Sequence, residues 1–383
     1  MPHFLAKTFQ GLEGVLAQEL TALGASAVRP VKRAVHFDGD QVLLYQANLW
    51  LRTALRILVP IHQYEASDEA ALYRGMQAIA WADYLRTDQT LAVDTVVNSR
   101  TFTHSHFVAL KTKDAVVDQF RQRSGRRPSV DTQAPDLRIH VHINDHTVRV
   151  LLDSSGESLH RRGYRLAGRK APLNEVLAAG LLKLAGWVPE QPLLDPMCGS
   201  GSIPIEAALV AANVAPGLLR QRFGFQQWRD YDRDLWQALR QDARSQRQRL
   251  VAPISGRDRS PAALNAAQAN ARRARVESFI NLTPGDFLTD PAPEQAGVLL
   301  MNPPYGERLG EADQRDFYRA IGDQFKQTYP GHQAWLISAN LQALKALGLK
   351  PSHKHTLYNG PLLCKFHGYE LYAGRKEPVE QSA

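Results

Sequence analysis

The stretch that decides the fold runs from residue 193 to residue 209 and reads LLDPMCGSGSIPIEAAL. It opens with a short apolar run, turns through Gly199 and Gly201, and continues as an apolar segment with Pro204 near its start. Glycine has no Cβ, so the backbone can turn tightly and approach a ligand closely, and proline is tolerated in the first turn of a helix. The stretch therefore predicts a strand, a glycine turn and a helix whose first free N–H groups point into the space beside the turn.

The chain downstream repeats this alternation of strand and helix, which is typical of a doubly wound parallel sheet. After the first strand, 192–195, the predicted strands are 251–258, 279–286, 298–302 and 332–338. The predicted helices are 173–184, 203–212, 261–273 and 316–328. Asn359-Gly360 lies between two further strand-like runs and predicts a closing antiparallel hairpin. Residues 173–383 are thus expected to form an α/β domain.

Upstream, strands and helices mix, and we expect an α+β region in two small units, 1–65 and 66–158. A basic linker at 159–172 follows it. A helix is predicted over 42–58, and an alternating strand over 137–144, where His140 and His142 are expected to face solvent.

Polar side chains end four of the predicted parallel strands. These residues are Asp195, Asp258, Asp286 and Asn302. Ligands of open α/β sheets bind outside the carboxyl ends of the strands, so three carboxylates and one amide are expected at one edge.

The glycine turn is neither a GxGxxG dinucleotide fingerprint nor a phosphate-binding loop, because the third glycine and a following Lys are both missing. Asp258 could accept both ribose hydroxyls of an adenosine group, although it lies 57 residues after Gly201. A simple dinucleotide unit needs only about 20, and we attribute the excess to an arginine-rich insert at 220–250 whose role the sequence leaves open. Asp286 could accept the adenine amino group, or could form an Asx-turn or a helix cap.

The tetrapeptide NPPY, from Asn302 through Pro303 and Pro304 to Tyr305, is the most specific element. Each proline biases the preceding residue to an extended conformation, so the Asn302 side-chain oxygen and the Pro303 carbonyl form a rigid pair of acceptors. A planar –NH2 group fits such a pair, which would hold its two protons and aim its nitrogen at an electrophile. Tyr305 could stack on the ring that carries the amine.

The chain is basic, with 46 Lys and Arg against 38 Asp and Glu among 383 residues, a formal net charge of +8. Cations gather between residues 100 and 127 and again in the linker. The alternatives are a nucleic-acid footprint or solvated helix faces and a flexible linker. The residues expected to contact RNA phosphates are Arg100, Lys111, Lys113, Arg126, Arg127, Arg161 and Arg162.

Composition excludes other classes: 44% hydrophobic and 22% charged residues indicate an ordinary globular protein, and no apolar run approaches the ~18 residues of a membrane span. The two cysteines form no CxxC pair, so we expect no metal and a reducing, cytoplasmic setting. His104 and His106 are expected to be surface or RNA-contacting residues, and Cys198 a small packed side chain with no triad partner.

The glycine stretch together with MNPPYGERLG, residues 301–310, resembles the class I S-adenosylmethionine-dependent methyltransferases that modify amino groups in RNA. Three upstream stretches resemble the THUMP RNA-binding domain of the bacterial 23S rRNA guanine-N2 methyltransferase family. They are SRTFTHSHFVALKTKDAVVDQF (99–120), RPSVDTQAPDLRIHVHI (127–143) and LDSSGESLHRRGYR (152–165). The resemblance covers residues 4 to about 375 and implies a ferredoxin-like unit, a THUMP domain and a Rossmann-like methyltransferase domain.

The resemblance also implies roles for the strand ends. Asp195, Gly199 and Gly201 would hold the methionine and sugar end of S-adenosylmethionine, with Pro196 and Cys198 in the same loop. Asp258 would hold the ribose and Asp286 the adenine, while Asn302, Pro303, Pro304 and Tyr305 would hold the target guanine. Some members carry a second methyltransferase domain, and since this chain ends at Ala383 a single reaction is expected.

The main hypothesis is methyl transfer to the N2 amine of a guanosine in large-subunit rRNA, free or in an assembly intermediate. The alternatives are the same chemistry on transfer RNA, methylation of DNA adenine or protein glutamine by the same tetrapeptide, and a catalytically silent RNA-binding assembly factor. The target nucleotide and the oligomeric state are not indicated by the sequence.

Overall fold

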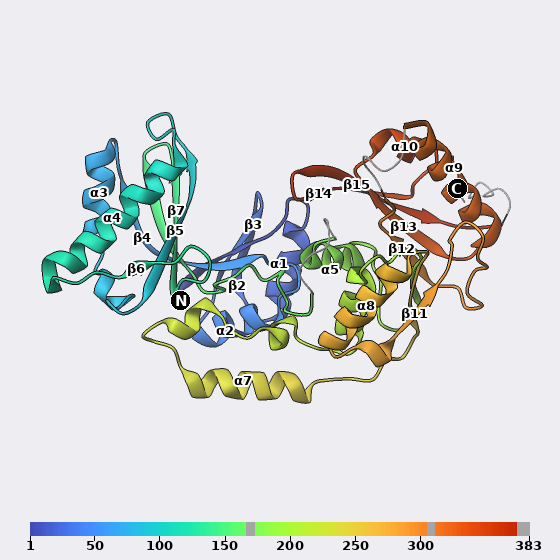
Figure 1. Cartoon of the computed structure of the whole chain (residues 1–383), viewed down its shortest axis with the longest axis horizontal. Helices are drawn as coiled ribbons and strands as arrows, with labels where there is room; N and C mark the ends of the chain where they lie inside the picture. The colour runs from blue at the N-terminus through green and yellow to red at the C-terminus, as the bar shows by residue number, and fades with distance from the viewer. Residues whose placement is uncertain (166–172, 305–310, 374–383) are drawn as a thin grey trace, which may run out of the picture. The chain divides into compact units, whose positions relative to one another are not determined.

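The structure is a computed structural model that describes residues 1–165, 173–304 and 311–373. The chain divides into two compact units (Figure 1). The N-terminal unit comprises Met1–Thr8, Leu16–Arg161 and Arg220–Asp242, and the C-terminal unit comprises Phe9–Val15, Arg162–Leu219 and Ala243–Ala383. No helix among the described residues has the length and apolar character needed to cross a membrane.

One sheet runs through the N-terminal unit. Its strand order is β2 (Ser26–Val31), β3 (Ala34–Asp38), β1 (His3–Lys7), β4 (Arg56–Glu65), β8 (Thr147–Asp153), β7 (Leu137–Asn144), β5 (Thr90–Asn98) and β6 (Ser129–Val130). β4 pairs antiparallel with both β1 and β8. The regions predicted as 1–65 and 66–158 therefore share a single sheet, and the boundary at residue 65 remains a prediction.

Helices α2 (Gln41–Trp50), α3 (Glu69–Gln77) and α4 (Ser105–Ser124) belong to this unit, while α1 (Glu13–Ala22) and α7 (Arg233–Ser245) run across the boundary between the units. Side chains of α3 and α4 pack with the strands into a core that includes Trp81, Phe120 and Ile139. The helix predicted over 42–58 was wrong at its end, because the backbone leaves the helix at Leu51 and enters β4 at Arg56.

The expectation that His140 and His142 face solvent was also wrong. His140 is buried, and its Nε2 lies 3.4 Å from the Asp153 carboxylate. His142 is only partly exposed, and burial together with the positive charge of Lys7 lowers its pKa to about 3.

The C-terminal unit contains the predicted doubly wound sheet. Its order is β11 (Ile280–Pro284), β10 (Ile254–Asp258), β9 (Leu193–Asp195), β12 (Val298–Met301), β13 (Gln333–Ser338), β15 (Leu362–Glu370) and β14 (His353–Asn359). The strands from β11 to β13 are parallel, and β15 and β14 are antiparallel, as the Asn359-Gly360 hairpin predicts. The helices are α5 (Glu175–Leu184), α6 (Ser202–Ala211), α8 (Pro261–Arg273), α9 (Glu311–Thr328) and α10 (Leu341–Lys345).

The chain moves outward from β9 in one direction through β10 and β11 and then returns to place β12 on the other side. This reversal makes the neighbourhood of β9 and β12 the topological switch point, where ligands bind in such sheets. The α/β fold class is confirmed.

The arginine-rich insert folds with the N-terminal unit up to Asp242, although the sequence on both sides of it belongs to the C-terminal unit. Arg220 is buried, and its guanidinium donates hydrogen bonds to the carbonyls of Ser155, Glu157, Ser158 and Arg161 at 2.8–3.1 Å. This arginine therefore fixes backbone and is not an RNA contact.

Aromatic packing holds the rest of the insert. Phe225 stacks on Tyr45 of α2 with ring centres 4.3 Å apart, and Trp236 lies edge-on to both rings. Gly224 lies against the backbone of β8, where an added Cβ would come within 2.3 Å of the Asp153 carbonyl oxygen. The insert is thus an integral part of the N-terminal core.

Candidate active site at the carboxyl edge of the C-terminal sheet

Strand register brings three of the predicted strand-end residues to one edge. Asp195 ends β9 and pairs with Gly256, two residues before Asp258 at the end of β10. On the other side of β9, Leu194 pairs with Leu299 of β12, and Asn302 follows that strand directly. Asp195, Asp258 and Asn302 therefore follow adjacent parallel strands, as predicted.

The glycine turn is tied to the end of β10. The Asp258 carboxylate accepts hydrogen bonds from the backbone N–H of Gly199 and from that of Ser260, both at 2.9 Å. The Cys198 N–H donates to the Arg257 carbonyl at 2.9 Å. The first and second strand ends, which were predicted to lie at one edge, are thus in direct contact.

Two glycines of the turn have left-handed backbone conformations, but for different reasons. Gly201 has φ +83°, and an added Cβ would lie 3.0 Å from the Ala267 Cβ of α8, so this glycine permits close helix packing. Gly199 has φ +54°, yet an added Cβ would meet no atom within 4 Å. The space beside Gly199 is therefore open, as a cofactor cradle requires.

The start of α6 faces the same turn. Gly201 occupies its N-cap position and makes no side-chain cap hydrogen bond. Free N–H groups in a first helical turn favour a ligand with acceptor atoms. The turn thus offers donors from α6 and acceptors from the two aspartates.

Asp195 is buried, and its Oδ1 accepts a hydrogen bond from the Met197 N–H at 3.2 Å. Burial, reinforced by the negative charge of Asp258, raises the pKa of this carboxyl well above its usual range. A ligand that brings positive charge or a hydrogen-bond donor stabilises the ionised form of such a carboxyl. The Asp195 carboxyl therefore fits the cationic, amine-bearing end of S-adenosylmethionine.

Cys198 packs in the turn and is buried. Its Sγ would lie 3.2 Å from a Cβ added to Gly256 of β10, so that glycine makes room for it. Burial raises the pKa of the thiol far above its ordinary value. Thiolate is the nucleophilic form, so the geometry agrees with a packed side chain.

Asp286 lies in a turn after β11. Its Oδ1 accepts a hydrogen bond from the Leu288 N–H at 3.1 Å, and Arg259 lies 3.5 Å from its Oδ2. The Asx-turn that the sequence left open is present, and a contact with adenine remains a prediction.

The Asn302 side chain has a polar atom whose hydrogen-bonding capacity is not used within the described part of the chain. Its Oδ1 is buried and has no hydrogen-bond partner among the described residues. A buried acceptor without a donor costs about 1–3 kcal/mol, so a ligand –NH2 group would relieve a real penalty. Pro303 is buried and Pro304 is exposed, while Tyr305 lies outside the described residues.

Of the predicted phosphate contacts, all except Arg162 have side chains that solvent reaches. Arg100, Arg126, Arg127 and Arg161 are exposed, and Lys111 is half-buried with its Nζ 5.5 Å from the centre of the Tyr73 ring. Lys113 is ion-paired with Asp114. All of these belong to the N-terminal unit.

Arg162 corrects the prediction. Its side chain is fully buried in the C-terminal unit, 3.5 Å from the Glu206 carboxylate of α6, so it does not present a cation to solvent. The Tyr164 hydroxyl donates to the same carboxylate at 3.1 Å.

The sequence did not indicate the contacts that Arg165 makes. Its guanidinium donates to the carboxylate of Glu175 at 2.8 Å, to the Leu173 carbonyl at 2.9 Å and to the Ser202 hydroxyl at 2.9 Å. Ser202 begins α6 directly after Gly201. The only signal in the sequence was a cation in a basic run, which does not distinguish this role from a phosphate contact.

Comparison with known families matches three consecutive parts of the chain. The family model described as RMKL-like, methyltransferase domain matches residues 162–367. The THUMP domain model matches residues 66–153, and the RlmL ferredoxin-like domain model matches residues 3–58.

Curated relatives cover nearly the whole chain. A Synechocystis protein, slr0064, which is named provisionally as an RNA methyltransferase, is 44% identical over 97% of both chains. The ribosomal RNA large subunit methyltransferase K/L of Syntrophotalea carbinolica is 40% identical over 96% of this chain. The match covers 53% of that relative, so the chain spans about half of its length.

A solved structure has the same fold throughout. SMU.472, provisionally described as a methyltransferase and solved in complex with SAH, superposes with a TM-score of 0.86 at 29% identity, covering 98% of this chain and 99% of its own. SAH is the product that S-adenosylmethionine leaves after it gives up its methyl group.

Proposed function

The chain belongs to the family of RMKL-like methyltransferases, and from that premise we propose that it transfers a methyl group from S-adenosylmethionine to the exocyclic N2 amine of a guanosine in 23S ribosomal RNA. The observation that carries the proposal is the buried Asn302 Oδ1, which has no partner among the described residues and follows the strand next to the glycine turn. The substrate is large-subunit rRNA, free or in an assembly intermediate, and the reaction belongs in the cytoplasm.

The carboxyl edge would hold the cofactor, which supplies an electrophilic methyl group when bound. Asp195 would face its cationic end, supported by Pro196 and Cys198 in the turn, and the open space at Gly199 would take its sugar. Asp258 already holds the turn through the Gly199 N–H and accepts the Ser260 N–H of its own loop, and its remaining lone pairs would accept the ribose hydroxyls. Asp286 would accept from the adenine.

Asn302 would act on the target amine. An exocyclic amine is a poor nucleophile because its lone pair is delocalised into the ring. The Asn302 oxygen and the Pro303 carbonyl would accept its two protons, localise the lone pair and aim the nitrogen at the methyl group. The base must leave its stack to reach them, as in other enzymes that work on a base. Tyr305 would stack on it.

The exposed and half-buried cations of the N-terminal unit would contact RNA phosphates. Arg100, Lys111, Arg126 and Arg127 lie on the THUMP part of the chain, and Lys113 and Arg161 carry the same expectation despite their ion pairs. Affinity for RNA should therefore fall steeply with salt concentration.

The test uses a strain that lacks the gene. Ribosomal and transfer RNA are digested to nucleosides, and N2-methylguanosine is quantified by mass spectrometry. We expect a loss confined to large-subunit rRNA that the wild-type gene restores and the Asn302→Ala gene does not. Purified Asn302→Ala protein should turn over about 100- to 1,000-fold more slowly while binding the cofactor normally.

Asn281→Ala is the matched control, since Asn281 is an exposed asparagine of β11 in the same unit. Full activity of Asn302→Ala would contradict the mechanism. A loss in transfer RNA would keep the chemistry and change the substrate, and no change in either RNA would favour a protein that acts by binding alone.

A further inference from the structure

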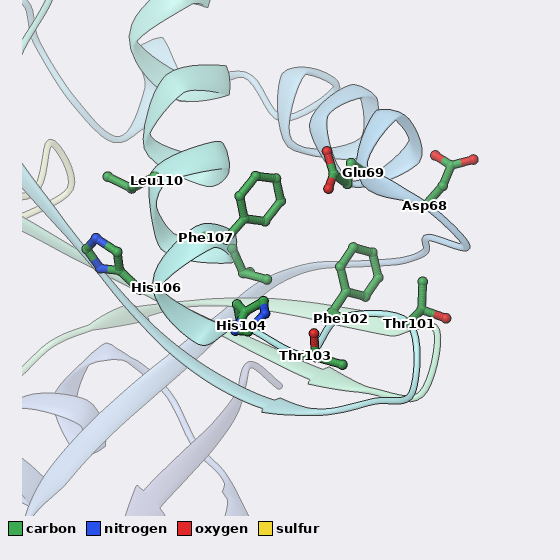
Figure 2. Close-up of a pocket in the computed structure, with 10 residues that line it drawn as sticks. Asp68, Glu69, Thr101, Phe102, Thr103, His104, His106, Phe107 and Leu110 are labelled. Atoms are coloured by element: carbon green, nitrogen blue, oxygen red, sulfur yellow. The ribbon is translucent and has the colours of Figure 1, made fainter.

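A pocket of about 680 Å³ lies in the N-terminal unit, and none of the residues assigned to the cofactor or to the target amine lines it. Figure 2 shows its walls, which come from the start of α3, the loop before α4 and the first turns of α4. The lining residues are Asp68, Glu69, Thr101, Phe102, Thr103, His104, His106, Phe107, Val108 and Leu110. The volume lies within the ~300–1,000 Å³ typical of small-ligand sites.

The apolar part of the pocket is an open aromatic wall. Phe102 is buried, but Phe107 is 37% exposed and Leu110 is 45% exposed, although both lie on a helix whose buried face already fills the core. A single exposed apolar side chain needs no explanation, whereas two within one turn of a helix, bordering a pocket, suggest a ligand with a flat apolar face.

The polar part supplies a free carboxylate. Asp68 accepts a hydrogen bond from the Ala71 N–H at 2.7 Å and thereby caps α3. Glu69 has no ion-pair or hydrogen-bond partner among the described residues, and Figure 2 shows its carboxylate on the pocket side of α3, beside the labelled aromatic rings. It can accept hydrogen bonds from a ligand amine.

The start of α4 adds a site for negative charge. Its N-cap residue, His104, makes no side-chain cap hydrogen bond, so the first N–H groups of this 20-residue helix lack the capping that α3 has. Such helix starts bind phosphate. Exposed Arg100 lies in the preceding loop, and Lys111 follows Leu110 on α4.

A ligand that combines a flat apolar face, an amine and a phosphate is a nucleotide. We infer that this pocket binds an unpaired nucleotide of the RNA substrate, distinct from the nucleotide that is methylated. Its base stacks on Phe107, its amino edge meets the Glu69 carboxylate, and its phosphate lies at the start of α4. The inference rests on the proposed RNA substrate and adds a second point at which the RNA is read.

The chemistry discriminates among bases. Adenine, cytosine and guanine carry an exocyclic amine that Glu69 can accept from, and uracil does not. Stacking on Phe107 is available to every base, because each has a flat π-face. The two side chains therefore make separable contributions.

The test measures the affinity of the full-length protein for single-stranded oligo(A), oligo(C) and oligo(U) of equal length by fluorescence anisotropy. Phe107→Ala should weaken binding of all three by about 5- to 150-fold, the range measured when a stacking residue is removed. Glu69→Gln should weaken binding of oligo(A) and oligo(C) relative to oligo(U), because only the first two offer an amine to the carboxylate. Val130→Ala is the matched control, since Val130 is 50% exposed in the same unit and outside the pocket.

Rates on rRNA from the deletion strain separate this inference from the proposed function. We expect Phe107→Ala to raise KM for rRNA and to keep kcat. Wild-type turnover combined with unchanged oligonucleotide affinity in both pocket variants would overturn the inference, leave the proposed function standing and favour a peptide as the occupant. Absence of turnover by the wild type on any RNA would overturn the proposed function, and the oligonucleotide affinities would still decide the pocket.

Discussion

Arg165 shows how a single side chain can link the helix that follows the glycine turn to an earlier part of the chain. It binds Glu175 of α5, the Leu173 carbonyl and the hydroxyl of Ser202, and Ser202 in turn donates to the same carbonyl at 3.1 Å. Burial raises the pKa of Glu175 and the charge of Arg165 opposes that rise. The guanidinium therefore offsets part of the cost of burying this carboxylate and fixes the first residue of α6.

Arg165→Lys is expected to weaken cofactor binding by up to about 30-fold, because an ammonium keeps the ion pair with Glu175 but cannot span the carbonyl and the hydroxyl as well, and each of the two lost hydrogen bonds is worth about 1 kcal/mol. Affinity for RNA and its dependence on salt should not change. Isothermal titration with S-adenosylmethionine and filter binding of rRNA over a salt series measure the two effects.

The control for Arg165→Lys is Arg161→Ala, which removes an exposed arginine four residues earlier. If Arg161 contacts a phosphate, this change should reduce the salt slope of RNA binding by about 1 and leave cofactor affinity intact. A fall in RNA affinity for Arg165→Lys with normal cofactor binding would mean that Arg165, too, serves the RNA.

These arginines also mark the limit of prediction at the residue scale. Arg161, Arg162 and Arg165 share one basic run, yet one is exposed, one is buried against Glu206 and one supports the residue that follows the glycine turn. Their partners come from distant parts of the chain, so no local pattern separates them. Asp195, Asp258 and Asn302 could be placed because the end of a strand is itself a local signal.

At the scale of the element, β7 carries a histidine in a place where charge is costly. Burial, together with Lys7, His140 and Arg149, lowers the pKa of His142 from 6.5 to about 3. Between these two values the unfolded chain binds a proton that the folded chain does not. The stability that neutral His142 contributes is thus complete above pH 6.5 and is lost as the pH falls toward 3.

We therefore expect the free energy of unfolding to decrease on acidification below pH 6.5, with His142 contributing up to about 1.4 kcal/mol per pH unit. His142→Gln should flatten this dependence, and His146→Gln, in the exposed turn after β7, should not. Urea unfolding at pH 7.0, 6.0 and 5.0 measures the slopes. Parallel slopes for the wild type and His142→Gln would show that other groups cause the acid sensitivity.

The same strand shows why some features of an element can be predicted from the sequence and others cannot. Leu137, Ile139, Val141 and Ile143 alternate as expected, but strict alternation indicates only that one face is apolar. The opposite face is covered as well, and only the tertiary fold reveals that. Similarly, residues 51–58 contain no glycine or proline that would mark the end of a helix, so helix α2 could not be separated from β4 by pattern alone.

At the scale of the whole molecule, the sequence indicated the family and the two fold classes, but not the path of the chain. The chain passes between the units at 8–9, 15–16, 161–162, 219–220 and 242–243. Composition places a seam at 159–172 because that stretch is basic and poor in apolar residues. Composition does not predict that residues 220–242 fold with the N-terminal unit. The aromatic side chains of this segment pack against Tyr45, almost 200 positions earlier in the chain.

This path predicts how the molecule behaves when it is cut at the seam. A fragment of residues 162–383 keeps the insert but loses the surface on which it packs, so Phe223, Phe225 and Trp236, now 1–2% exposed, would face water. Each such ring buries about 150–250 Å², enough together to make a large apolar patch. We expect this fragment to aggregate, and the same fragment with 220–242 replaced by a Gly-Ser linker to stay monodisperse in size-exclusion chromatography. Both fragments lack residues 9–15, so the comparison isolates the insert. A monodisperse first fragment would show that the insert does not depend on the N-terminal unit for its burial.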